Sequence, residues 1–184
     1  FTQPALFLSY FPVSSSNLSA PHLALFLQTQ YDATPGATCY IIKSGINDTY
    51  HVTTDKGKYV FRVYSLHWRT DTEISEELRL LQMLKENEVP VSWPVADKQG
   101  KFIQVLNAPE GNRFGVLFSF AAGEKLPLYA DEAHFKAGAI MARMHQLTHQ
   151  LTLERVTYTP HVLLDDALES IKKFLPAGNA EMDF

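Results

Sequence analysis

The sequence has almost no cysteine: Cys39 is the single one among 184 residues. One cysteine cannot form a disulfide within the chain, so a reducing cytoplasm is the expected compartment. Long apolar runs are also lacking, since no stretch reaches the roughly 18 uninterrupted apolar residues that a membrane span needs. Excess positive charge is lacking too, because the net charge is −4. These absences argue against a membrane or a nucleic acid as the partner.

What the sequence does have is apolar and aromatic content, with 46% hydrophobic and 12% aromatic residues. That is enough for one sizeable core, or for one small domain plus part of another. The opening run 1–11 has no cationic start and contains Pro4, so it does not predict a signal peptide. Because the first residue is Phe1 and not Met, we expect a trimmed or partial N-terminus.

A short apolar strand at 58–64 carries one cation, Arg62. Side-chain alternation along a strand places Arg62 on the face opposite Phe61 and Val63. A guanidinium in the middle of a half-buried strand costs free energy unless it has a partner. The pattern therefore predicts a carboxylate opposite this strand.

The next segment, 72–88, is predicted to be a helix with one carboxylate on its apolar side. The apolar residues that recur at helical spacing are Ile74, Leu78, Leu81 and Leu84. Glu77 falls inside this stripe, whereas Glu73 and Glu76 fall on the outer side. A carboxylate buried with the stripe needs a cation or several donors, and Arg62 is the nearest candidate in sequence.

A strand cation paired with a helix carboxylate has two interpretations. In kinase-type phosphotransferases the carboxylate orients the cation, and the cation neutralises the phosphate oxygens of a nucleotide. In other α+β domains the same pair is an ordinary buried ion pair. The two residues alone leave both interpretations open.

The remaining elements follow from hydrophobic periodicity and turn residues. The predicted strands are 39–43, 50–54, 58–64, 102–106 and 114–120, with the 72–88 helix between the third and the fourth. The predicted flanking helices run from about residues 19–21 to between 32 and 36, from about 131 to 151 and from about 163 to 174. The 131–151 helix is apolar on two sides, so it needs more partners than residues 152–184 can supply.

Seven local motifs occur in a specific order between about residues 19 and 150. They are Ser44-Gly45-Ile46-Asn47-Asp48-Thr49-Tyr50, Tyr59-Val60-Phe61-Arg62-Val63-Tyr64, Glu77-Leu78-Arg79-Leu80-Leu81, Val89-Pro90-Val91, Val116-Leu117-Phe118, Gly123-Glu124 and Ala142-Arg143-Met144-His145. The element order β-β-β-α-β-β resembles the small lobe of the protein-kinase fold. The motifs resemble more specifically the aminoglycoside phosphotransferase family, which includes choline-kinase-like and homoserine-kinase-like enzymes.

The resemblance implies an α+β, protein-kinase-like fold with a five-stranded antiparallel sheet. Residues 1–18 would form an N-terminal arm, 19–122 the nucleotide-binding lobe, and 123–184 the hinge and the incomplete start of a helical lobe. The activity implied is transfer of the γ-phosphoryl group of ATP to a hydroxyl of a small polar substrate, with Mg²⁺ required.

Family roles then fall on particular residues of this chain. The loop 45–49 would close over the phosphates, Arg62 would hold them, and Glu77 would fix Arg62. Residues 119–122 would form the hinge whose free backbone groups read the adenine edge. The candidate nucleotide-binding residues are Ser44, Gly45, Ile46, Asn47, Asp48, Thr49, Val60, Arg62, Glu77, Phe118, Ser119, Phe120 and Ala121. Without the family, 45–49 is a hairpin loop, and Val60 and Phe118 are core residues.

The chain departs from the family in one respect. Family members carry a His-Gly-Asp segment that supplies the catalytic aspartate, followed by asparagine and aspartate metal ligands. No His-Gly-Asp occurs in these 184 residues, so no catalytic and no metal-binding residue is assigned, and the chain alone is expected to be inactive. The pair His145 and His149 could chelate a metal at helical spacing, but structural hydrogen bonding is the preferred interpretation.

Two other hypotheses remain. A non-catalytic, pseudokinase-like nucleotide-binding module would bind a partner, or itself, through the uncovered face of the 131–151 helix. An unrelated α+β sensor domain would leave the pair Arg62 and Glu77 without a ligand. The acceptor substrate is not encoded in any motif of the chain.

Overall fold

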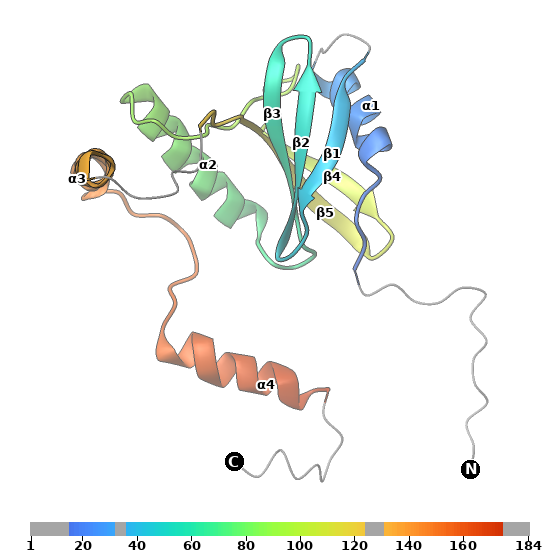
Figure 1. The fold of residues 1–184 in the computed structure, drawn as a ribbon. Coiled ribbons are helices and arrows are strands. Elements are labelled where there is room, and N and C mark those ends of the chain that lie inside the picture. The colour runs from blue at the N-terminus through green and yellow to red at the C-terminus, as the bar shows by residue number, and fades with distance from the viewer. Residues whose placement is uncertain (1–14, 32–35, 124–130, 175–184) are drawn as a thin grey trace, which may run out of the picture. The chain divides into compact units, whose positions relative to one another are not determined.

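Five antiparallel strands form the centre of the fold (Figure 1). In the computed structural model of the chain, residues 15–31, 36–123 and 131–174 are described. The strands are β1 (Thr38–Lys43), β2 (Asn47–Thr54), β3 (Gly57–Tyr64), β4 (Ile103–Ala108) and β5 (Gly111–Ser119), in the spatial order β1-β2-β3-β5-β4. All five predicted strands are present. The largest differences are at the starts of β2 and β5, each of which begins three residues earlier than predicted, at Asn47 and Gly111.

Two hairpin turns end on glycines that adopt positive φ. Gly57 has φ of 135° and Gly111 has φ of 136°, a conformation that side chains with a Cβ rarely adopt. These turns set the strand register, because each hairpin pairs outward from its turn. The register places Thr49 opposite Arg62, and so brings the start of β2 beside the cation predicted in β3.

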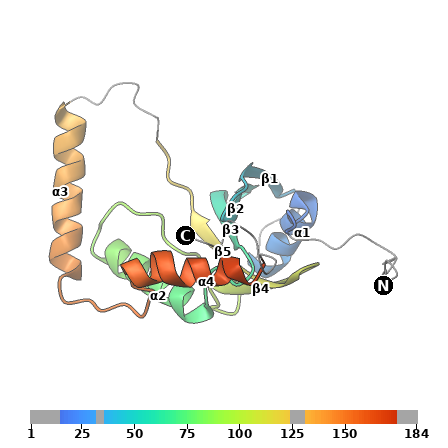
Figure 2. The ribbon, with the colours of Figure 1, turned by 90° about the horizontal axis from the view of Figure 1, so that it is seen from below.

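Helix α1 (Ala20–Tyr31) covers one face of the sheet, as Figures 1 and 2 show from two directions. Pro21 lies in its first turn, where the missing N–H costs no hydrogen bond. Leu23 and Leu27 of the helix are buried against the strands. The strand residues in this core are Tyr50, Val52, Phe61, Val63, Leu106 and Leu117. We call this side the α1 face.

Helix α2 (Asp71–Glu86) packs on the opposite side, the α2 face, against Tyr64, Val116 and Phe118. Thr70 caps the helix: its hydroxyl accepts from the Glu73 backbone N–H, and the Glu73 carboxylate accepts from the Thr70 N–H. The prediction that Glu73 lies on the outer side is wrong. It is 9% exposed, because the capping box draws the carboxylate back onto the first turn.

Three further helical segments follow the sheet: α3 (Asp131–Thr148), the π-helical turn η1 (His161–Asp165) and α4 (Asp166–Lys172). They match the two predicted C-terminal helices, although α3 ends three residues earlier. The chain divides into two compact units, 1–153 and 154–184. The predicted lobe boundary at residue 122 stays a prediction. Across the described ranges no helix is both long and apolar enough to cross a membrane.

Candidate functional site

The structure joins the two charged residues that the sequence singled out. Arg62 Nη1 lies 3.0 Å from Glu77 Oε1, so β3 and α2 are linked by an ion pair on the α2 face. The side chains are 35% and 22% exposed. The predicted pairing is confirmed, but the pair is half-buried and open to solvent, not enclosed in the core. Such a pair contributes little to stability, and its cation remains accessible.

Two aromatic rings flank the Arg62 guanidinium. Its Cζ lies 4.9 Å from the ring centroid of Phe118 and 5.9 Å from that of Tyr64. Rings at these distances attract a cation through their negative faces. Phe118 also lies opposite Val60 in the β3–β5 pairing. The two predicted wall residues, Val60 and Phe118, are therefore cross-strand neighbours beside Arg62.

A second aromatic group lies on the same face; it joins the predicted residue Phe120 to Tyr40 and His51, which the sequence interpretation missed. The Tyr40 and His51 rings stack with centroids 4.9 Å apart, and His51 meets Phe120 edge-on at 5.3 Å. The strand register aligns Tyr40, His51, Val60 and Phe118 across four strands. This row has the apolar and π character that a flat heterocycle requires. The sequence could have indicated His51: side chains alternate along β2, so the residue two positions after Thr49, which lies opposite Arg62, is on the same face.

The predicted loop 45–49 is shorter in the structure. Only residues 44–46 lie between β1 and β2, and Asn47, Asp48 and Thr49 belong to β2. Alternation then sends Thr49 to the α2 face and Asp48 to the α1 face. Asp48 is buried there, with Oδ2 2.9 Å from Arg113 Nη2. Asp48 therefore does not lie with Arg62, and the expectation that it helps to cover phosphates is not supported by this geometry.

Arg113 is a second cation that the sequence interpretation missed. It lies on β5 with a side chain only 1% exposed. Its Nε donates to the Tyr64 carbonyl at 2.8 Å, and its Nη1 donates to the Ser16 carbonyl at 2.6 Å. A carboxylate oxygen of Glu110 lies 3.4 Å from Nη1. The predicted strand began at residue 114 and so left Arg113 outside it, whereas β5 begins at Gly111 and places this cation inside the strand, as in the case of Arg62.

The predicted hinge 119–122 divides into two parts. Ser119 is the last residue of β5 and is buried; its N–H donates to the Trp93 carbonyl at 2.9 Å, and its Oγ accepts from the Trp93 N–H at 3.0 Å. The expectation of a free backbone N–H at Ser119 is therefore wrong, because the segment around Trp93 continues the sheet there. Phe120 and Ala121 follow β5 and are exposed.

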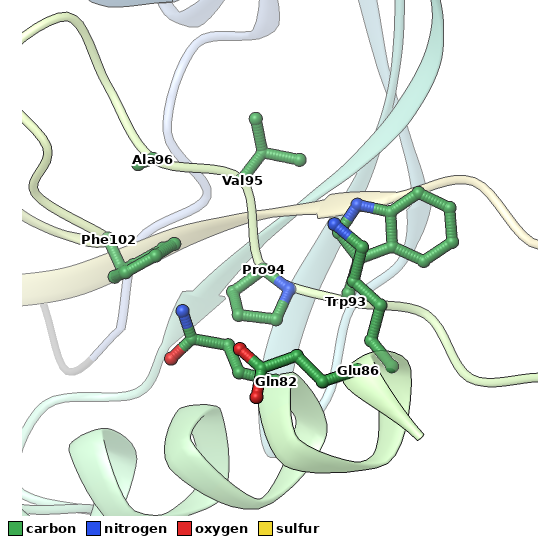
Figure 3. Close-up of a pocket in the computed structure, with 8 residues that line it drawn as sticks. Gln82, Glu86, Trp93, Pro94, Val95, Ala96 and Phe102 are labelled. Carbon is green, nitrogen blue, oxygen red and sulfur yellow. The ribbon is translucent and has the colours of Figure 1, made fainter. Parts of the chain in front are cut away.

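The hollow drawn in Figure 3 is a different place. It has a volume of about 380 Å³ and lies between the C-terminal half of α2 and the extended segment around Pro94. Figure 3 shows Gln82 and Glu86 close to Pro94, with Phe102 and Trp93 on either side. None of its lining residues belongs to the predicted nucleotide set. Lys85 Nζ lies 4.7 Å from the Trp93 ring centroid, so that aromatic face already has a cation.

Neither a reactive thiol nor a metal centre emerges from the described residues. Burial raises the pKa of the Cys39 thiol to about 11, so Cys39 is a neutral core residue at physiological pH. Over the described ranges no three His, Cys, Asp or Glu side chains cluster as metal ligands would. His149 lies beyond the end of α3, and its Nδ1 contacts the Gln146 carbonyl at 2.8 Å. It therefore does not share a helical face with His145.

The comparison with protein families agrees with the observed fold. Residues 41–172 match the phosphotransferase enzyme family. The chain is also 33% identical over 168 residues to the uncharacterized protein sll1119 of Synechocystis, an alignment that covers 90% of this chain and 46% of that protein. The chain belongs to the phosphotransferase enzyme family. It spans about half the length of the curated relatives it matches.

Solved structures show the same fold. A microcompartment-associated aminopropanol kinase superposes with a TM-score of 0.64 at 22% identity, covering 79% of this chain and 47% of that one. Amicoumacin kinase hAmiN, in complex with AMP-PNP, Ca²⁺ and Ami, superposes with a TM-score of 0.61 at 19% identity, covering 88% and 55%. At these identities the likeness concerns the fold, and it confirms the predicted α+β, kinase-like architecture.

Proposed function

We propose that the chain is the ATP-binding half of a small-molecule kinase that transfers the γ-phosphoryl group of ATP to a hydroxyl of a small polar substrate. The observation that carries the proposal is the half-exposed pair Arg62 and Glu77 beside an aromatic row. A cation that is oriented by a carboxylate yet open to solvent can exchange water for phosphate oxygens. A guanidinium enclosed by protein, with all its donors in use, could not do so.

The arrangement of the α2 face supports a definite orientation of the nucleotide. The adenine would lie against the row that contains His51, Val60 and Phe118, because stacking and apolar contact favour a flat heterocycle there. The phosphates would then reach Arg62, which is two residues from Val60 on the same face of β3. Thr49, opposite Arg62, would offer its hydroxyl to the same phosphates.

Glu77 would act on Arg62 and not on the nucleotide. With Oε1 3.0 Å from Nη1, it holds one corner of the guanidinium and leaves the rest of the planar fork able to turn toward an anion. Arginine is suited to this role because it keeps its charge at all physiological pH values and can make two contacts with one phosphate.

Mg²⁺ would accompany ATP, since a divalent ion neutralises phosphate charge in phosphoryl transfer. We place its protein ligands, and the residue that activates the acceptor hydroxyl, in the part of the longer relatives that this chain does not span. The acceptor belongs to the class of small polar alcohols. A cytoplasmic location fits the use of ATP and the single cysteine.

The test is protection of the full-length protein against heat by Mg-ATP. We expect Mg-ATP to raise the melting temperature of the unaltered protein and to lose this effect in Arg62→Ala. Arg79→Ala is the matched control, because Arg79 is an exposed arginine of α2 that pairs with Glu76 on the same helix. Equal protection of Arg62→Ala and the unaltered protein would overturn the role of Arg62.

Experiments on the same purified protein distinguish phosphoryl transfer from nucleotide binding without transfer. Consumption of ATP that depends on an added amino alcohol or sugar would support the kinase, as would phosphorylation of that acceptor. Protection by Mg-ATP with no transfer to any acceptor, together with concentration-dependent self-association, would favour a non-catalytic nucleotide-binding module instead.

A further inference from the structure

The β1–β2 turn, residues 44–46, is held by the segment that precedes α1. Asn17 Nδ2 donates to Ser44 Oγ at 2.9 Å and to Asp48 Oδ1 at 2.9 Å. Ser44 Oγ donates in turn to the same Asp48 oxygen at 2.7 Å. One amide group therefore bridges the residues on both sides of the turn, and each donor in this triangle has an acceptor.

The triangle has a rigid base. Arg113 Nη2 binds the second oxygen of Asp48, and the two side chains are 1% and 5% exposed. Arg113 Nη1 also donates to the carbonyl of Ser16, next to Asn17. On the other side of Asn17, Tyr50 Oη donates to the Leu18 carbonyl at 2.8 Å. Both neighbours of Asn17 are thus fixed to the sheet, so its amide is aimed before any ligand arrives.

The far end of the turn is tethered as well. The Ser65 hydroxyl, just after β3, donates to the Ile46 carbonyl. Between the two tethers lies Gly45, where an added Cβ would meet nothing within 4 Å. The turn is therefore fixed at both ends, while its middle residue faces open space. This differs from a flexible loop that closes over a nucleotide.

We propose that Asn17 is a positioning residue, which keeps the β1–β2 turn ordered so that its backbone can meet the nucleotide phosphates without a closing step. The proposal rests on the proposed function, since it assumes a nucleotide on the α2 face. Ordering a loop before binding removes a conformational cost from the binding step. Asn17 makes no contact with the nucleotide in this account, and acts through Ser44 and Asp48.

The sharpest test compares ligands with and without phosphates. In the full-length protein, dissociation constants for Mg-ATP, Mg-ADP and adenosine are measured by calorimetry or competition for the unaltered protein and for Asn17→Ala. We expect Asn17→Ala to weaken Mg-ATP and Mg-ADP by roughly 3- to 10-fold, the effect of losing one or two exposed hydrogen bonds. Adenosine affinity should stay unchanged, because the turn lies toward the phosphate end.

Two further variants serve as controls. Asn17→Asp keeps the shape of the side chain but places a carboxylate beside Asp48, so it should weaken Mg-ATP at least as much as Asn17→Ala. Asn107→Ala removes an exposed amide from β4 and should leave all three affinities unchanged. The melting temperature of each variant shows that it is folded at the temperature of the measurement.

The outcomes are distinguishable. Equal weakening of adenosine and Mg-ATP in Asn17→Ala would show a general structural role and overturn the proposal, as would unchanged affinity for all three ligands. Failure of the unaltered protein to bind Mg-ATP would remove the proposed function itself, and the positioning role with it. Selective loss of the phosphate-bearing ligands supports both.

Discussion

The two faces of the sheet each carry an arginine–carboxylate pair, and the pairs differ in almost every physical respect. On the α1 face, Arg113 and Asp48 are buried, and all three guanidinium nitrogens of Arg113 donate hydrogen bonds. On the α2 face, Arg62 and Glu77 are half-exposed, and the guanidinium lies over aromatic rings. The first pair is enclosed by protein, whereas the second is open to a ligand.

This difference shows that charge and strand position alone do not separate a structural arginine from a functional one. Both arginines sit inside apolar strands and both face a carboxylate. Burial and the number of donors already in use distinguish them, because a saturated, enclosed cation cannot bind a new anion. By this criterion Arg113 and Asp48 stabilise the fold, whereas Arg62 and Glu77 remain the proposed nucleotide site.

The largest expected effect comes from breaking the buried pair. Arg113→Met should lower the free energy of unfolding by about 3–5 kcal/mol, because it leaves Asp48 and Glu110 buried without their cation. Arg62→Met should lower it by less than about 1 kcal/mol, since a half-exposed pair is well solvated. Urea denaturation of both variants measures the contrast. Similar losses in the two variants would contradict the division between the faces.

The next effect tests the packing of the α1 face. A Cβ added to Gly115 would lie 2.6 Å from Phe61 Cζ and 3.0 Å from Leu106 Cδ1. Gly115→Ala should therefore cost about 1–3 kcal/mol, because overpacked cores force side chains and backbone to shift. Gly45→Ala, at a position with open space around it, is the control and should change stability by under about 0.5 kcal/mol. A neutral Gly115→Ala would mean that this core is looser than described.

A smaller effect concerns the start of α2, which aims Glu77 at Arg62. Thr70→Ala removes the hydroxyl that accepts from the Glu73 backbone N–H at 3.2 Å, and should cost about 1 kcal/mol, the usual value for an N-cap. Thr70→Ser keeps the hydroxyl and should be close to neutral. Thermal denaturation of the two variants gives the comparison, and equal melting temperatures would argue against the capping box.

The smallest effect is a pH dependence on the α1 face. Burial acts to raise the pKa of Glu110, but hydrogen bonds from Ser16 and the charge of Arg113 bring it below its ordinary value of 4.5. A lowered folded-state pKa contributes stability above about pH 4.5, and this contribution is lost as pH falls through the folded-state value. Glu110→Gln should thus weaken the acid dependence of stability below pH 4.5. An unchanged acid limb in denaturation curves would contradict this.

Local sequence patterns were sufficient to predict the helices and strands and the pairing of Arg62 with Glu77. The alternation around Arg62 predicts one strand, and the helical spacing around Glu77 predicts one helix. The two residues meet because α2 directly follows β3 in the chain and packs on the face of the sheet that carries Arg62. The family resemblance then supplied the kinase-like architecture. In both cases the information lies in short segments of sequence.

Other features depend on contacts between distant segments. Asp48 was assigned to a loop because β2 was expected to begin at residue 50. The strand begins at Asn47, so Asp48 is part of it, and strand alternation places the Asp48 side chain on the α1 face, away from Arg62. Apart from Glu110, three residues earlier, the residues that Arg113 binds lie 49 to 97 positions away in sequence, so no local pattern identifies them. The N–H of Ser119 was expected to be free because nothing in the sequence predicts that the Trp93 segment extends the sheet.

The most direct test of the central claim is a double-mutant cycle on Arg62 and Glu77, measured both by Mg-ATP affinity and by unfolding free energy. The variants are Arg62→Met, Glu77→Gln and the double variant. We expect the two residues to couple by about 1 kcal/mol or more in Mg-ATP affinity, because Glu77 acts through Arg62, and by less than about 0.5 kcal/mol in unfolding. Coupling in unfolding with none in Mg-ATP affinity would make this pair structural, like Arg113 and Asp48, and would contradict the account.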